Sequence, residues 1–481
     1  MLVQQGIRIP IWGKAEPGER VTVELGEDAA KAVADDDGRW LVSLPKQKAG
    51  GPLGMTISGK DSGLTVSDIL VGEVWVCSGQ SNMQFGLASS NNAEAEIAGA
   101  TYPEMRLFTV ERKVATEPQE DCAGSWSVCS PETAAGFSAV GYLFGRELHT
   151  TLGVPVGLIH TSWGGTPAES WTTQSTLESD PDLTPMLERW AKLEQNYPAA
   201  KAAHDASMAK WKAAAEKAKA EGKPGPSKPR GPMHPMHAHR PAGLYNAMIA
   251  PLVPYALQGA IWYQGESNAS RAYQYRELFP AMIEDWRRAW DQGAFPFLFV
   301  QLANFRETKA EPEPSDWAEL REAQSMTLGL KNTGMAVIID IGDAKDIHPR
   351  NKQDVGKRLA LNALANTYGK DVAYSGPMYK SMKVKGDTVE IEFAHMDGGL
   401  VVKGGGALQG FAIAGEDQKF VWADAVIEGK KVMVSADGIE APKAVRYAWA
   451  DNPICNLYNG AGLPASPFRT DDWPGLTLAK R

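Results

Sequence analysis

Five short apolar runs, separated by stretches with helical periodicity, constrain the fold of this chain more than any other feature. Runs of this length suit strands that are buried on both faces, and their alternation with helices is typical of a parallel sheet covered on both sides. We therefore predict an α/β fold with a doubly wound, parallel, five-stranded sheet. The predicted strands lie at residues 74–77, 154–160, 257–263, 297–302 and 335–340, and the predicted helices include 137–152, 273–290 and 355–368.

The segments on either side of this alternating region have the pattern of β structure. Residues 1–68 carry apolar alternation between Gly, Asp and Pro turns, which predicts a small N-terminal β-sandwich. The same alternation over residues 380–448 predicts a second small β domain. The α/β domain would then span residues 69–379, and residues 449–481 would form a C-terminal segment that packs back on it.

An insertion at about residues 176–240 interrupts the α/β domain. It is rich in Ala, Lys and Glu, and it ends in a Pro- and Gly-rich run at residues 222–232 that no helix tolerates. We predict a helical hairpin or lid with a mobile loop. His234, His237 and His239 follow this run, and their spacing and Pro-rich setting favour a surface loop over a metal cluster.

Charge and apolar content exclude several classes of protein. The 481-residue chain has a formal net charge of −9, which argues against a nucleic-acid partner. Its longest apolar stretches fall short of the roughly 20 residues that a membrane-spanning helix needs, so no membrane partner is expected. The N-terminus lacks the charged head and apolar core of a signal peptide. We expect a cytoplasmic protein, or a periplasmic or secreted one if a signal peptide has been removed.

The four cysteines give little sign of a redox or metal role. Cys77 ends an apolar run and is expected in the core, whereas Cys122 and Cys129 are close enough in sequence to pair. No Cys/His spacing typical of zinc is present, so neither a metal nor another cofactor is expected.

Polar residues follow several of the predicted strands, at the place where open α/β sheets bind their ligands. After the first strand, the run Ser-Gly-Gln-Ser-Asn-Met at residues 78–83 places Ser81 at a strand-to-helix turn. After the second, Gly164 and Gly165 allow the backbone to approach a ligand and to point N–H groups at a developing oxyanion. Each stretch alone is an ordinary polar turn, so the functional interpretation depends on finding them together.

Two further stretches supply amide, carboxylate and imidazole groups. After the third strand, Gln264 and Asn268 are candidate oxyanion donors, and Glu266 is a candidate acid, base or buried acceptor. After the fifth, His348 is a candidate general base whose other nitrogen a nearby aspartate would hold. Because all four stretches follow parallel strands, they would meet at one edge of the sheet. Ser, His and Asp with spare amide donors are the groups that acyl transfer needs.

At these residues the chain resembles the sialate O-acetylesterase family of carbohydrate esterases, within the SGNH (GDSL-like) hydrolase superfamily. The resemblance covers most of the chain. It implies a flavodoxin-like catalytic domain with added β domains, and an enzyme that removes O-acetyl groups from sugars by an acyl-enzyme route without a metal. It is carried by residues 72–83, 162–166, 262–268 and 346–349, and by the tail at 456–459 and 462–469.

The resemblance assigns roles to the polar residues. It implies that Ser81 is the nucleophile and that His348 is the base. The implied oxyanion donors are the N–H of Ser81, the N–H of Gly164 or Gly165, and the side-chain amide of Gln264 or Asn268.

The carboxylate behind the histidine is assigned separately, because the chain departs here from the wider superfamily. The superfamily has an Asp three residues before its His, but this chain has Lys345 at that position. We therefore expect Asp346 to orient His348. Asp343 is the second candidate for this role and Glu266 the third.

Aromatic residues beside these stretches suit an acetylated carbohydrate as substrate, because aromatic faces pack against sugar rings. Trp163, Trp171 and Tyr263 are the candidate substrate-binding residues, and core packing is an equally good interpretation of each. A sialic acid O-acetyl ester and an acetylated polysaccharide such as xylan are both open as substrate, and the oligomeric state is open too. The alternative is a non-catalytic carbohydrate-binding protein on the same scaffold, which the presence of both Ser81 and His348 disfavours.

Overall fold

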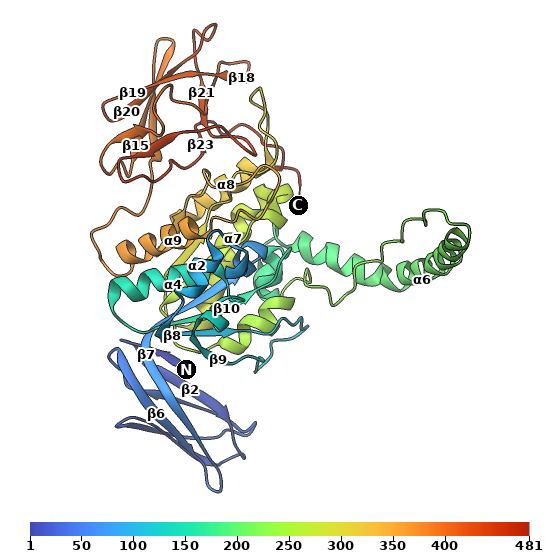
Figure 1. Cartoon of the computed structure of the whole chain (residues 1–481), viewed down its shortest axis with the longest axis vertical. Helices are drawn as coiled ribbons and strands as arrows, with labels where there is room; N and C mark the ends of the chain where they lie inside the picture. Colours follow the sequence, from blue (N-terminus) through green and yellow to red (C-terminus); the bar gives the residue numbers. More distant parts are fainter. Residues whose placement is uncertain (481) are drawn as a thin grey trace.

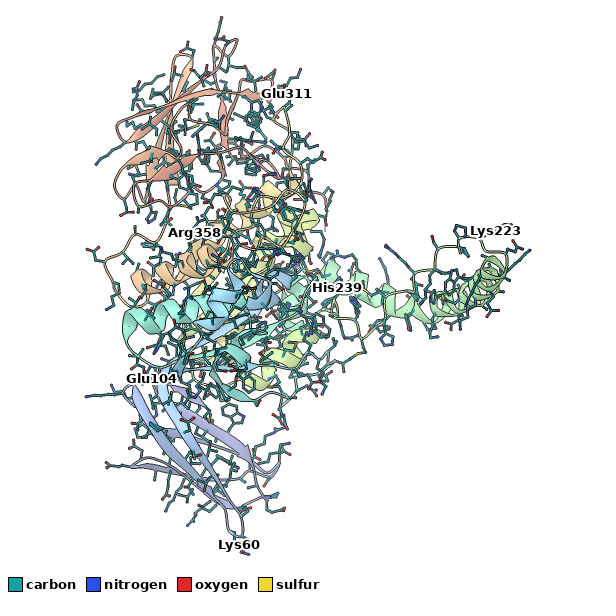
Figure 2. The ribbon with its side chains drawn as sticks, viewed as in Figure 1. Lys60, Glu104, Lys223, His239, Glu311 and Arg358 are labelled. Atoms are coloured by element: carbon teal, nitrogen blue, oxygen red, sulfur yellow. The ribbon has the colours of Figure 1, made fainter. Side chains whose placement is uncertain are left out.

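The computed structural model of the chain describes residues 1–480 and has three units in a row (Figure 1). A β unit that contains the N-terminus lies at one end, an α/β unit in the middle and a second β unit at the other end. The helix α6 (Thr184–Ala220) projects sideways from the middle unit. In Figure 2, Lys223 marks the far end of this arm and His239 lies near its base.

The large sheet of the middle unit contains the five predicted strands and two more. Its main path runs β13-β12-β11-β7-β10-β8-β9. All neighbours in this path are parallel except β8 and β9, which are antiparallel. The predicted α/β class with a parallel sheet is confirmed, but the sheet is larger than the five strands predicted. The strands are β7 (Gly63–Gly79), β8 (Tyr102–Thr109), β9 (Trp126–Cys129), β10 (Val156–Ser162), β11 (Gly259–Tyr263), β12 (Phe297–Val300) and β13 (Thr333–Ala336).

The strand β8 escaped prediction because its sequence mixes charged and apolar residues. Its first half is largely exposed, and Glu104 points into solvent near the edge of the molecule (Figure 2). In its buried half, Arg106 forms an ion pair with Asp68, with both carboxylate oxygens 2.9 Å from Nη2. A strand near the edge of a sheet tolerates such residues, whereas the five central runs are mostly apolar.

Helices cover both faces of this sheet. On one face Trp75 of β7 packs edge-on against Phe144 of α4, with ring centroids 5.0 Å apart, and α9 lies beside α4. On the other face Trp262 of β11 packs against Trp286 of α7 at 5.9 Å, and α8 lies beside α7. Trp262 is paired with Ser78, three positions from Trp75, so the two tryptophans point to opposite faces. The helices are α1 (Ser81–Gln84), α2 (Ala93–Ala98), α3 (Pro131–Ala134), α4 (Ala139–Leu152), α5 (Gln174–Ser179), α7 (Ala272–Trp290), α8 (Asp316–Met326) and α9 (Lys352–Asn366).

The N-terminal β unit shares its longest strand with the central sheet. β7 pairs with β6 along residues 63–71, with β10 along residues 73–79 and with β11 along residues 75–79. The expected boundary after residue 68 therefore falls inside a single continuous strand. The unit has a core of its own around Val23 and Leu44. Its other strands are β1 (Leu2–Gln4), β2 (Ile9–Lys14), β3 (Arg20–Leu25), β4 (Asp28–Val33), β5 (Arg39–Leu44) and β6 (Gly50–Ser58).

The C-terminal β unit takes in most of the tail that was expected to pack separately. Its sheets have the orders β14-β15-β20-β19, β18-β17-β21-β23 and β16-β22, so the tail strands β22 and β23 complete two of them. The tail also packs on the α/β unit: Ser466 accepts a hydrogen bond from Nε2 of Gln301 at 3.1 Å, and Oγ1 of Thr477 accepts one from the N–H of Tyr273 at 2.9 Å. The strands are β14 (Met378–Lys385), β15 (Thr388–Ala394), β16 (Leu400–Val402), β17 (Phe411–Ala414), β18 (Phe420–Trp422), β19 (Asp424–Glu428), β20 (Lys431–Ser435), β21 (Ala444–Tyr447), β22 (Leu457–Asn459) and β23 (Phe468–Arg469).

A fully buried arginine joins the C-terminal unit to the α/β unit. Arg321 of α8 donates to the carbonyl oxygens of Leu302 and Ala303, at 2.8 Å each. It also donates to those of Ala450 and Asp451, at 2.6 and 2.9 Å. Burial lowers the pKa of the guanidinium to about 9, and the charge of Asp451 opposes this shift. Four carbonyl groups from two units thus replace the water that the cation has lost.

The insertion is one long helix with an extended return rather than a helical hairpin. α6 runs for 37 residues, and its Ala, Lys and Glu content supports a helix that is exposed along most of its length. The returning segment contacts the helix, where the indole N–H of Trp211 donates to the carbonyl oxygen of Pro226 at 2.8 Å. Within residues 1–480 no helix, α6 included, combines the length and apolar character needed to cross a membrane.

Replacing Gly79 with alanine should destabilise the protein more than replacing a glycine with space around it. Gly79 has a φ of +138°, and a Cβ there would collide with the carbonyl oxygen of Tyr263. We expect Gly79→Ala to cost at least about 2 kcal/mol of unfolding free energy. Gly153→Ala, where φ is +66° and no neighbouring atom lies within 4 Å, should cost only about 1 kcal/mol. Thermal unfolding checks this, and equal losses for the two variants would contradict it.

Candidate active site

The register of the central sheet brings three strand ends to one level. Gly79, the last residue of β7, is paired with Ser162 of β10 on one side and with Tyr263 of β11 on the other. The chain visits β8 and β10 on one side of β7 and then crosses to β11 on the other, so β7 lies at a topological switch point. The loops after these strands therefore face one another, and Ser81, the first residue of α1, lies among them.

Ser81 and His348 are within hydrogen-bonding distance. Nε2 of His348 lies 2.8 Å from Oγ of Ser81. On the other side of the imidazole, Oδ1 of Asp346 lies 3.3 Å from Nδ1 of His348. The same oxygen accepts a hydrogen bond from the backbone N–H of His348 at 2.9 Å. The three side chains therefore stand in the order hydroxyl, imidazole, carboxylate, which is the arrangement of nucleophilic catalysis.

The carboxylate of this group is exposed to water. The side chain of Asp346 is 52% exposed and that of His348 is 34% exposed. The pKa of Asp346 is lowered, first by the hydrogen bond from the backbone N–H of His348 and then by the charge of the imidazole. Asp346 is therefore ionised at neutral pH. Because water screens its charge, its electrostatic effect on His348 is smaller than that of a buried carboxylate.

The two other carboxylate candidates have different partners. Asp343 is exposed, and its Oδ1 accepts a hydrogen bond from the backbone N–H of Lys345 at 2.8 Å. Oε1 of Glu266 accepts a hydrogen bond from Nδ2 of Asn82 at 2.7 Å. Burial raises the pKa of Glu266, and its Oε2 has no hydrogen-bond partner within residues 1–480. Among the three candidates, Asp346 is the one in contact with the imidazole.

The two glycines expected to bind an oxyanion differ in what their N–H groups contact. The N–H of Gly164 donates to Oε1 of Gln84 at 2.7 Å, although Gly164 lies against the Cα and Cβ of Ser81. This donor is therefore occupied in the structure. Gly165 is exposed with a φ of +75°, and its N–H forms no hydrogen bond with any part of the chain between residues 1 and 480.

The two amides expected to assist them are buried and have other partners. Nε2 of Gln264 donates to Oδ1 of Asn268 at 2.7 Å, and Oε1 of Gln264 accepts from the hydroxyl of Tyr275 at 2.9 Å. Nδ2 of Asn268 donates to Oε2 of Glu169 at 2.9 Å, while its Oδ1 also accepts from the N–H of Ala168 at 3.0 Å. These contacts correct the expected role, because both amides hold the loop after β10 instead of pointing a donor at Ser81.

A third amide, which sequence reasoning missed, has a free donor next to the serine. Oε1 of Gln80 accepts from the N–H groups of Gly265 and Ser267, at 3.3 Å each. Its own backbone N–H donates to the carbonyl oxygen of Tyr263 at 3.0 Å. No residue between 1 and 480 accepts a hydrogen bond from Nε2 of Gln80, which is thus free for a ligand. Its only signal in the sequence was its place directly before Ser81, in the turn that follows the first predicted strand.

Asn82, directly after the serine, cross-links the loops of the site. Its Nδ2 donates to Oε1 of Glu266 at 2.7 Å and to the carbonyl oxygen of Ile347 at 3.0 Å. Its Oδ1 accepts from Nζ of Lys352 at 2.5 Å. One buried amide thus connects the turn that carries Ser81, the loop after β11 and the loop that carries His348.

Lys352, in the first turn of α9, is a fully buried cation beside this amide. Its ammonium lies 4.9 Å from the ring centroid of Phe85 and 5.2 Å from that of Tyr263. Burial lowers its pKa to about 7, and the charges of Glu266 and Asp346 oppose this shift. Sequence reasoning missed Lys352 because it lies four residues after the histidine in a run of ordinary helical sequence.

Only one of the three aromatic residues proposed to bind substrate is accessible. Trp163 is half-buried and lies under the guanidinium of Arg112, 5.7 Å from its ring centroid. Trp171 is 0% exposed and Tyr263 is 1% exposed. Trp171 packs against Trp262 at 6.0 Å, as part of the core. Neither buried ring can stack on a sugar, so core packing is the correct interpretation of Trp171 and Tyr263.

The cysteines and histidines form neither a disulfide nor a metal cluster in the described part of the chain. All four cysteines are free, including Cys122 and Cys129, which were considered able to pair. His237 and His239 pack edge to face with ring centroids 4.5 Å apart. No group of three His, Cys, Asp or Glu side chains within residues 1–480 is arranged to hold a metal ion.

The fold and the Ser81–His348 contact have the form of a hydrolase, and comparison with known proteins identifies its family. The family model described as "Carbohydrate esterase, sialic acid-specific acetylesterase" matches residues 71–203 and 235–365, which is more than half of the chain. The chain therefore belongs to the sialic acid-specific acetylesterase family of carbohydrate esterases and is a carboxylic ester hydrolase. This confirms the resemblance and the enzyme class predicted from the sequence.

Individual relatives support this membership over nearly the whole chain. The sialate O-acetylesterase of Mus musculus is 32% identical over 95% of this chain and 90% of its own length. The sialate O-acetylesterase of Homo sapiens is also 32% identical, over 97% of this chain and 90% of its own length. A solved structure of a carbohydrate acetylesterase from Xanthomonas citri is 39% identical, has a TM-score of 0.83, and covers 98% of this chain and 97% of its own. The family match omits residues 204–234, which form the outer part of the α6 arm and its return.

Removing the charge of Lys352 should impair the site without reaching Ser81 directly. Lys352→Met leaves Oδ1 of Asn82 without its donor and leaves the buried carboxyl of Glu266 without a nearby cation. We expect kcat for a soluble acetyl ester to fall roughly ten- to a hundredfold, as small displacements of reacting groups do. Lys357→Met, on the exposed side of the same helix, should leave kcat unchanged. Equal activity of the two variants would show that Lys352 does not position the site.

Proposed function

We propose that this protein is a serine esterase that removes O-acetyl groups from a carbohydrate through an acetyl-enzyme intermediate. The observation that carries the proposal is the 2.8 Å contact between Oγ of Ser81 and Nε2 of His348. A serine hydroxyl becomes a competent nucleophile when a base within hydrogen-bonding distance takes its proton. The sialate and carbohydrate acetylesterases to which the chain is similar support acetyl as the acyl group and a sugar as the alcohol.

In the proposed first half-reaction, Oγ of Ser81 attacks the acetyl carbonyl carbon as Nε2 of His348 takes the hydroxyl proton. Asp346 holds Nδ1 and stabilises the imidazolium. Collapse of the tetrahedral intermediate breaks the bond to the sugar oxygen, which receives the proton from His348. In the second half-reaction, water gives a proton to His348 and attacks the acetyl carbonyl carbon. Collapse of the second tetrahedral intermediate breaks the bond to Oγ of Ser81, which receives the proton from His348 as acetate leaves.

The oxyanion of both tetrahedral intermediates needs donors that other groups have not taken. We propose the backbone N–H of Ser81, the N–H of Gly165 and Nε2 of Gln80 for this role. The last replaces the amides of Gln264 and Asn268, whose partners lie elsewhere. Because Oε1 of Gln80 is held by two backbone N–H groups, its donor would be oriented before substrate binds.

An acidic sugar is favoured by a basic cavity next to the site. A cavity of about 200 Å³ lies between the base of α6 and the loops after β10 and β11, and Arg189, Arg271 and Ser267 line it. Arg271 is neutralised by Glu169 at 2.6 Å, whereas Arg189 has no carboxylate partner within residues 1–480. The unpaired guanidinium of Arg189 suits the carboxylate of a sialic acid ester. An acetylated neutral polysaccharide such as xylan would make no use of it.

Loss of the serine hydroxyl should abolish turnover. We expect Ser81→Ala to lower kcat by at least about a thousandfold, since a group that forms the covalent intermediate cannot be replaced by its neighbours. Acetate release from a panel of acetylated sugars is the measurement. Turnover at the wild-type level would remove Ser81 from the mechanism.

The matched pair Asp346→Asn and Asp343→Asn separates the orienting carboxylate from a neighbouring one. Asp346→Asn should lower kcat roughly ten- to a hundredfold, less than in enzymes whose orienting carboxylate is buried. Asp343→Asn should retain full activity, because its carboxylate is exposed and contacts the N–H of Lys345. The reverse order of effects would assign the role to Asp343.

A change at Arg189 should separate acidic from neutral substrates. We expect Arg189→Gln to raise KM for an O-acetylated sialic acid by roughly tenfold, the loss of about one charge-assisted hydrogen bond, with kcat unchanged. KM for acetylated xylan should stay the same. Lys192→Gln, on an exposed position of the same helix, is the control. An unchanged KM for the sialate ester in Arg189→Gln would argue against an acidic substrate at this cavity.

A further inference from the structure

A second cavity lies at the junction of the C-terminal β unit with the α/β unit, away from the catalytic group. Its volume is about 440 Å³, within the range of roughly 300–1,000 Å³ in which proteins bind small ligands. Strand β18, the segment that precedes α8 and the C-terminal tail enclose it. Ser81, His348 and Asp346 do not line it. The mechanism proposed above therefore makes no use of this cavity.

Aromatic side chains form much of its wall. Phe420, Trp422, Trp449 and Trp473 all line the cavity. The rings of Phe420 and Trp473 pack with centroids 5.6 Å apart. Trp422 is 40% exposed, and its indole N–H donates to the carbonyl oxygen of Ala310 at 2.6 Å. The edge of that indole is thereby anchored while much of the ring stays accessible, as a stacking surface for a ligand requires.

The two arginines of this wall are paired with carboxylates. Nε and Nη2 of Arg446 each donate to Asp471 at 2.8 Å. The guanidinium of Arg446 also lies 4.1 Å from the ring centroid of Phe420. Arg469 donates to Glu322 at 2.7 Å. The cavity therefore offers fixed polar groups between aromatic rings without an unpaired arginine, unlike the smaller cavity at Arg189.

We propose that this cavity is a second saccharide site that binds neutral sugar units of the glycan or polysaccharide that carries the acetyl ester. The C–H face of a sugar ring would pack on Trp422 or Trp473, and its hydroxyls would bond to side chains at the rim such as Gln418. Because both arginines are already paired, an anionic ligand would have to break an ion pair to bind them, which favours a neutral ligand. That the sugar belongs to an acetylated glycan rests on the proposed function, whereas saccharide binding at this cavity needs no catalytic residue.

One segment of the chain connects the cavity with the loop that carries His348. The segment that follows β12 contacts the loop that carries His348, since Phe305 forms a parallel β-bridge with Asp343. The same segment continues to Pro312 and Pro314 in the cavity wall. A polymer held at the second site would therefore be kept near Ser81, which raises its effective concentration there. KM for a polymeric substrate should depend on this site, and KM for a free acetylated monosaccharide should not.

Calorimetric binding to the Ser81→Ala protein tests the site without turnover. The probes are two neutral tetrasaccharides, xylotetraose and lacto-N-neotetraose, and one acidic trisaccharide, sialyllactose. We expect at least one neutral probe to bind, and Trp422→Ala in the same background to weaken it by about tenfold or more. Val421→Ala, which changes an equally exposed neighbour in β18 that does not line the cavity, should have no effect. Trp422→Tyr, which keeps a ring, should retain most of the affinity.

Two results would overturn the proposal: no binding of either neutral tetrasaccharide, or equal binding to Trp422→Ala and Val421→Ala. Trp473→Ala, in the tail, gives an independent test should Trp422→Ala fold poorly. Acetate release from an acetylated monosaccharide, measured with Ser81 intact, reports on the proposed function alone. Wild-type release with no saccharide binding would refute the second site only, whereas binding without any release would refute the esterase proposal only.

Discussion

Pairing of Gly79 with both neighbours of β7 is the constraint from which the site follows. Ser162 and Tyr263 flank Gly79 in register, so the loops after three strands begin at one height. The missing Cβ lets the carbonyl of Tyr263 pass over this position, and the same carbonyl then accepts the N–H of Gln80. A slip of one residue would move Ser81 by about 3.3 Å, further than its hydrogen bond to His348 spans.

Behind the reacting groups lies a layer of buried amides that fix one loop to another. Asn82 bridges a buried carboxyl, a buried ammonium and a backbone carbonyl, and Asn268 bridges Glu169 and the loop after β10. Each of these buried groups needs a hydrogen-bond partner, so removing one of them leaves the others unpaired. This layer also explains why Glu266 does not serve the histidine: its carboxyl is held by Asn82.

Sequence reasoning correctly predicted those segments whose residue types fit only one kind of structural environment. The central strands were found because they are buried on both faces, and β8 was missed because charged residues such as Arg106 find partners only in the folded chain. Ser81 and His348 were selected from residue type and position at strand ends, and Asp346 was preferred over Asp343 by comparison with the superfamily pattern; their catalytic roles stay predictions. The hydrogen-bond partners of Gln264 and Asn268 could not be predicted. An amide at a strand end can point either into the cleft or into the protein, and only packing decides which.

The α6 arm and the aromatic residues also depend on packing that the sequence does not reveal. A run rich in Ala, Lys and Glu predicts a helix, but whether it folds back as a second helix depends on the Pro-rich segment after it, which here returns as extended chain. Trp171 and Tyr263 are adjacent to the site in sequence yet turn into the core, whereas Trp422 and Trp473, far away in sequence, are accessible at a cavity.

Continuity of β7 across two units has a consequence for how the protein unfolds. The N-terminal unit and the α/β unit share this strand, which continues to the turn that carries Ser81, although Asp68 within it has a φ of +55°. Because the two units share a strand and not a linker, we expect them to unfold together.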